Sequence, residues 1–127
     1  MSHDMPSKIT VLIADDHRLF AEALEAILSA EPEIEVVGRA SNGEEAVAQA
    51  LELKPDVILM DIAMPVVDGV EATKRIRAKH QGACVLMLTG SNSRTDVARA
   101  RDAGAAAYVT KDRIAAQLIE AIRELAA

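Results

Sequence analysis

Five short apolar runs alternate with five amphipathic patterns along this chain of 127 residues, and this alternation is what most restricts its fold. The apolar runs are residues 9–14, 34–37, 57–60, 83–88 and 106–109. The first, third and fourth are apolar almost throughout, as strands that are covered on both faces must be. A strand–helix unit repeated five times predicts an α/β domain with a parallel sheet, right-handed crossovers and helices on both faces.

The patterns between these runs have apolar residues three or four positions apart, as in helices with one buried face. In the first pattern Leu19, Ala23 and Ile27 follow this spacing. Residues 41–44 (SNGE) predict a capping box at the start of the second helix, and residues 93–96 (SRTD) predict the start of the fourth. We therefore expect one domain over residues 8–127, preceded by a flexible N-terminus at residues 1–7.

Charge and composition exclude several functions. The chain has 20 acidic and 14 basic residues, which argues against nucleic acid as a partner of this domain. Phe20 and Tyr108 are its only aromatic residues, and Cys84 is its only cysteine, so neither a base-stacking platform nor a disulfide framework nor a cysteine zinc site is expected. The longest apolar run is far below the roughly 18 residues of a membrane span. We expect a cytoplasmic protein without a membrane partner.

Polar side chains follow directly on the predicted strands, at the edge where open α/β sheets bind ligands. In chain order these strand ends carry Asp15 and Asp16, Asp61, Thr89 and Lys111. Three crowded carboxylates would raise one another's pKa unless a cation lies among them. Because all their ligand atoms are oxygens, the cation that suits them is Mg²⁺ rather than zinc.

This group of residues is suited to phosphoryl chemistry. A Mg²⁺ site beside a lysine ammonium and a hydroxyl group can bind a phosphoryl group, and a carboxylate there can act as the nucleophile and form an aspartyl phosphate. Asp61 is the best candidate, because it stands alone after the central strand, whereas Asp15 and Asp16 form a pair suited to the metal. A purely structural role for Asp61 is hard to explain between Met60 and Ile62, because burying an unpaired charge is costly.

The segments that carry these residues resemble the receiver domain of response regulators in two-component signalling. They are residues 11–17 (VLIADDH), 57–69 (VILMDIAMPVVDG), 88–89 (LT) and 108–111 (YVTK). Their order and spacing match that family from residue 8 to residue 126. The resemblance implies a doubly wound, flavodoxin-like (βα)₅ fold, with a five-stranded parallel sheet in the order 2-1-3-4-5.

The resemblance also implies a partner, a cofactor and residue roles. A histidine kinase would transfer its phosphoryl group to Asp61. Mg²⁺ would be bound directly by Asp16 and largely through water by Asp15, with Asp61 and the backbone carbonyl of Ala63 completing the protein ligands. Lys111 would pair with the phosphoryl oxygens. Such a domain catalyses its own phosphorylation and dephosphorylation and is not otherwise an enzyme.

By the same resemblance, Thr89 and Tyr108 would carry the signal. The Thr89 hydroxyl would move toward the phosphoryl group, and the Tyr108 ring would turn inward into the space that is vacated. The responding surface would be the fourth helix, the fifth strand and the fifth helix. Dimerisation through this surface, or through the first and fifth helices, is left open, and so is a simple packing role for Tyr108.

The run ADDH at residues 14–17, with Leu19 and Phe20, resembles the LuxR/NarL-type branch of the family. We therefore expect the N-terminal part of a transcriptional regulator that binds DNA through a C-terminal domain absent from this chain. The alternative is a stand-alone or phosphorylation-independent receiver that acts by protein contact. An aspartyl-phosphate phosphohydrolase is less favoured, because such enzymes usually have a carboxylate two residues after the nucleophile, where this chain has Ala63.

Two residues beside the predicted site have simpler interpretations. Asp16 could serve only as the N-cap of the first helix, a position that favours aspartate. Its neighbour Asp15 makes capping alone a less complete explanation of the pair. His17 is expected to be a surface residue at the start of the first helix, with no role in accepting phosphate.

Overall fold

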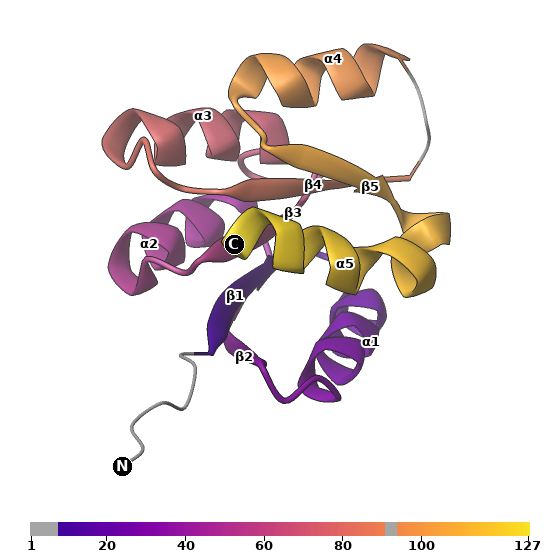
Figure 1. Cartoon of the computed structure of the whole chain (residues 1–127). Helices are drawn as coiled ribbons and strands as arrows, with labels where there is room; N and C mark the ends of the chain where they lie inside the picture. The colour runs from indigo at the N-terminus through magenta and orange to yellow at the C-terminus, as the bar shows by residue number, and fades with distance from the viewer. Residues whose placement is uncertain (1–7, 91–93) are drawn as a thin grey trace.

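The computed structural model describes residues 8–90 and 94–127, which form one sheet covered by helices (Figure 1). The strands are β1 (Ile9–Ala14), β2 (Ile34–Ala40), β3 (Val57–Asp61), β4 (Val85–Thr89) and β5 (Ala107–Thr110). The helices are α1 (Arg18–Ser29), α2 (Gly43–Leu53), α3 (Gly69–Lys79), α4 (Arg94–Ala103) and α5 (Ile114–Ala126), and a short 3-10 helix, η1 (Lys111–Arg113), precedes α5. All strand pairs are parallel and the order is β2-β1-β3-β4-β5, which confirms the predicted fold class and strand order.

The sheet has an apolar core on each face, because successive side chains of a strand point to opposite sides. On one face Leu12, Ile58 and Met87 pack with apolar residues of α2, α3 and α4. On the other face Ile13 and Leu59 pack with apolar residues of α1 and α5. Both sets of strand residues are buried, which explains why the central strands have apolar residues at every position rather than at alternate ones.

Strand pairing decides which side chains meet at the carboxyl edge of the sheet. The interior strand β3 pairs with β1 on one side and with β4 on the other. Asp61, its last residue, lies opposite Leu88 of β4, and Thr89 of β4 lies opposite Thr110 of β5. Because all five strands run in the same direction, their polar C-terminal residues gather at one edge.

Several predicted boundaries are corrected by the structure. The strand β2 continues to Ala40 rather than ending at residue 37, because its backbone pairs with β1 up to the Ala14–Ala40 pair. The apolar pattern does not predict this extension, because it contains the polar Arg39 and the small Gly38. The strand β4 begins at Val85 rather than at residue 83.

The cap of α2 lies one residue later than predicted. The side chain of Asn42 accepts a hydrogen bond from the amide of Glu45 at 2.8 Å, so Asn42 rather than Ser41 is the N-cap. The Glu45 carboxylate in turn accepts from the amide of Ser41 at 2.8 Å. The predicted flexible segment 1–7 and the predicted helix start at Ser93 lie outside the described residues. Within the described part of the chain, no helix is both long enough and apolar enough to span a membrane.

Candidate functional site

Two carboxylates are buried at the carboxyl edge of the sheet. Asp15 directly follows β1 and Asp61 ends β3, and each is only 3% exposed. Burial raises the pKa of the Asp61 carboxyl, and the nearby charge of Asp15 raises it further. The ammonium of Lys111 and the amide of Ala63 act in the opposite direction without cancelling these effects. The site therefore favours a cation beside Asp61.

Lys111 reaches both buried carboxylates from the end of β5. Its Nζ lies 3.1 Å from Oδ2 of Asp15 and 3.4 Å from Oδ2 of Asp61. The same ammonium lies 4.3 Å from the ring centroid of Phe20 on α1, a distance at which a cation is attracted to the face of an aromatic ring. The structure thus brings Asp15, Asp61 and Lys111 together, although Lys111 is 96 residues from Asp15 in sequence.

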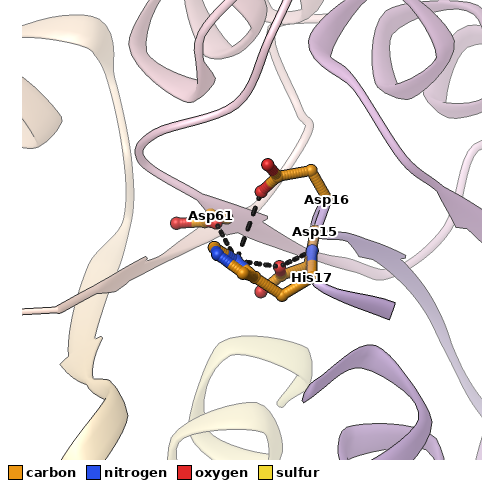
Figure 2. Close-up of side chains that lie close together, drawn as sticks. All are labelled: Asp15, Asp16, His17 and Asp61. Carbon is orange, nitrogen blue, oxygen red and sulfur yellow. Dashed lines mark hydrogen bonds and ion pairs between the residues drawn. The ribbon is translucent and has the colours of Figure 1, made fainter. Parts of the chain in front are cut away.

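Asp16 and Ala63 lie at the open side of this cluster. The side chain of Asp16 is 31% exposed and lies above the buried pair (Figure 2). The N-cap of α1 is His17, so the interpretation of Asp16 as the N-cap is wrong. The amide of Ala63 donates a hydrogen bond to Oδ1 of Asp61 at 3.3 Å. An open cavity of about 470 Å³, lined in part by Asp16, Ala63 and Asp68, gives access to this side of the cluster.

The two predicted switch residues differ in their environments. Thr89, the last residue of β4, is completely buried and lies in register with Thr110, the residue before Lys111. Tyr108 on β5 is 42% exposed and lines a cavity of about 410 Å³ against α4. The structure therefore places Thr89 at the same edge of the sheet as the cluster, and Tyr108 on the surface of α4 and β5. Their roles in switching stay predictions.

His17 is the residue of this cluster that the sequence reasoning missed. Its side chain is 67% exposed, as expected, but Nδ1 lies 3.2 Å from Asp15, 3.3 Å from Asp16 and 3.8 Å from Asp61 (Figure 2). The backbone explains this orientation: the amide of His17 donates to Oδ1 of Asp15 at 2.8 Å, which closes a turn from residue 15 to residue 17. A histidine directly after two aspartates was the available signal.

The residues present fit a divalent cation. Asp15, Asp16, His17 and Asp61 each offer one ligand atom, and these atoms all lie within 4.8 Å of one another. Three of the four donors are carboxylate oxygens, which are the usual protein ligands of Mg²⁺. The raised pKa of Asp61 supports this assignment, because bound positive charge would relieve the repulsion between the buried carboxylates.

We expect Asp61→Asn to be more stable than the wild type in metal-free solution, by a difference that grows as the pH rises. A carboxyl whose pKa is raised by folding contributes stability below its ordinary value of 3.8, and that contribution is lost as the pH rises through the folded value. Asparagine has the same shape but cannot ionise. Urea unfolding of both proteins in EDTA, at a series of pH values from about 4 upward, measures the difference. Equal stabilities at neutral pH would contradict the prediction.

Comparisons with known proteins agree on one family. The family model for the response regulator receiver domain matches residues 11–123. The response regulator protein VraR of Staphylococcus aureus (strain Mu3 / ATCC 700698) is 44% identical over 116 residues, which is 91% of this chain and 56% of VraR. The chain thus spans about half the length of this relative.

Solved structures show the same likeness over nearly the whole domain. A two-component response regulator of the LuxR family from Aurantimonas sp. SI85-9A1 is 32% identical with a TM-score of 0.90, over 94% of this chain and 86% of that chain. The response regulator domain of Thermotoga maritima CheB is 36% identical with a TM-score of 0.88, over 94% of this chain and 96% of that chain.

Proposed function

The chain belongs to the response regulator receiver domain family, and from that membership we propose that a histidine kinase transfers a phosphoryl group to its Asp61 carboxylate. One observation carries the proposal: the buried Asp61 lies beside Asp15 and within 3.4 Å of the Lys111 ammonium. A nucleophilic carboxylate and a fixed cation are what acceptance of a phosphoryl group requires.

The residues divide the chemistry among them. A carboxylate oxygen of Asp61 attacks the phosphorus of a phosphohistidine, and the new O–P bond forms as the N–P bond breaks and the histidine nitrogen leaves with the electron pair. Lys111 offsets the charge of the phosphoryl oxygens, and Thr89 offers them its hydroxyl. Asp15, Asp16, Asp61 and the carbonyl of Ala63 would hold Mg²⁺, which supplies further positive charge against those oxygens when bound.

We further propose that this receiver, over residues 8–127, acts in the cytoplasm as part of a LuxR/NarL-type transcriptional regulator. Relatives of that type support the assignment, and a DNA-binding domain would belong to the part of such a regulator that this chain does not span. Phosphorylation would act through Thr89 and Tyr108 on the surface formed by α4, β5 and α5. That surface is also a candidate for homodimer formation.

Intact-mass measurement after incubation with a small acyl phosphate tests the proposal. We expect a single phosphoryl adduct that forms with Mg²⁺ and does not form in EDTA. Reduction of the acyl phosphate with borohydride, followed by peptide mapping, should place the adduct on Asp61. An adduct on another residue would overturn the assignment of the nucleophile. If neither an adduct nor a complex with beryllofluoride and Mg²⁺ formed, the contact-only alternative would replace the proposal.

A further inference from the structure

We propose that His17 makes this cluster a site for a nitrogen-preferring divalent cation such as Zn²⁺, in competition with Mg²⁺. The ligands would be Nδ1 of His17 and one carboxylate oxygen each of Asp15, Asp16 and Asp61. This inference rests on the proposed function only in that it uses the same three carboxylates. It adds a ligand of a different chemical kind and a second class of metal ion.

The spacing of the donor atoms supports the proposal. In a tetrahedral site with bonds of roughly 2.0–2.1 Å, the ligand atoms lie roughly 3.3–3.4 Å from one another. Nδ1 of His17 lies 3.2 Å from Oδ1 of Asp15 and 3.3 Å from Oδ1 of Asp16, which are close to that spacing (Figure 2). Its distance of 3.8 Å to Oδ2 of Asp61 is slightly longer.

The charge of the cluster and the exposure of His17 also favour this cation. Three carboxylates face His17, and the Lys111 ammonium pairs with two of them, so the cluster is negatively charged when the imidazole is neutral. The His17 side chain is 67% exposed, and its Nδ1 already faces Asp15 at 3.2 Å in a hydrogen bond that an entering ion would replace. The turn from Asp15 to His17 meanwhile holds the backbone at the site.

The nitrogen donor decides which metal is preferred. Mg²⁺ favours oxygen ligands and keeps several of its waters, so the imidazole adds little to its binding. Imidazole nitrogen suits Zn²⁺ and related transition metals, which also bind a given mixed site more tightly. A tetrahedral ion held by four protein ligands has no open position for a phosphoryl oxygen. Zn²⁺ would therefore inhibit phosphorylation of Asp61 by displacing Mg²⁺.

The test compares metal selectivity in untagged wild-type protein, His17→Ala and His80→Ala. His80 is a matched control because it is a half-buried histidine at the other end of α3 from the cluster. Zn²⁺ and Mg²⁺ affinities are measured by calorimetry, and Co²⁺ reports the coordination geometry by its visible absorption. We expect an intense tetrahedral Co²⁺ spectrum in the wild type and in His80→Ala but not in His17→Ala. The ratio of Zn²⁺ affinity to Mg²⁺ affinity should fall by about 10- to 100-fold or more in His17→Ala alone.

An unchanged affinity ratio in His17→Ala would overturn the inference, and so would a weak six-coordinate Co²⁺ spectrum in the wild type. The Mg²⁺-dependent phosphoryl adduct separates this failure from failure of the proposed function. If the adduct forms but the ratio of Zn²⁺ affinity to Mg²⁺ affinity is unchanged in His17→Ala, the phosphoacceptor proposal is supported and His17 is not a metal ligand. A tetrahedral Co²⁺ spectrum that depends on His17, in a protein that forms neither the adduct nor the complex with beryllofluoride and Mg²⁺, supports the metal site and overturns the phosphoacceptor proposal.

Discussion

Asp61→Asn is expected to abolish the phosphoryl adduct, with a loss on the order of 10⁴-fold or more in the rate of its formation. The asparagine amide keeps the shape of the side chain but has no nucleophilic carboxylate oxygen. It also keeps a carbonyl oxygen that can accept the 3.3 Å hydrogen bond from the amide of Ala63. Intact mass after incubation with acyl phosphate and Mg²⁺ measures the loss.

Asp112→Asn provides the matched control for this experiment. Asp112 is an exposed carboxylate on η1, directly after Lys111, so the same change of charge occurs close to the site without touching the buried pair. The control should form the adduct at nearly the wild-type rate. Since Asp61→Asn is expected to be more stable than the metal-free wild type at neutral pH, unfolding would not explain its loss of the adduct. Adduct formation by Asp61→Asn at the wild-type rate would show that a residue other than Asp61 is the nucleophile.

Gly69→Ala is expected to reduce the free energy of unfolding by about 3 kcal/mol or more. A Cβ atom at Gly69 would overlap the carbonyl oxygen of Asp61 and would lie 2.9 Å from the Cα atom of Ile62. These are backbone atoms at the buried end of β3, so no side-chain rotation can relieve the overlap. The better helix propensity of alanine recovers at most about 1 kcal/mol at this first position of α3.

Gly82→Ala is the matched control, because a Cβ atom there would meet only Cε1 of His80, at the ordinary contact distance of 3.5 Å. Urea unfolding of both variants and the wild type gives the comparison, and the control should stay within about 0.5 kcal/mol of the wild type. An equally small effect of both substitutions would show that the backbone at Gly69 can move away from the backbone at Asp61 without a measurable loss of stability. The backbone of that segment also places the Ala63 amide against Asp61.

The grouping of the buried Asp15 and Asp61 with Lys111 could be predicted from the sequence alone. Each residue follows an apolar run, and the carboxyl ends of parallel strands meet at one edge of the sheet. The resemblance to receiver domains added the strand order, which the structure confirms. The resemblance also added the roles of Thr89 and Tyr108. These roles stay predictions, because the structure shows only where the two residues lie.

The fold class could be predicted from the amino-acid sequence, because short runs with apolar residues at every position, alternating with amphipathic helical patterns, are typical of strands that are covered on both faces. How side chains from separate segments meet depends on the packing of the folded chain. The Nδ1 atom of His17 lies 3.8 Å from Asp61, a residue 44 positions away, and Gly69 lies where any side chain would overlap the end of β3. Periodicity reports which face of an element is buried. It carries no information about the rotation of an exposed imidazole or the distance between two backbones, because packing sets both.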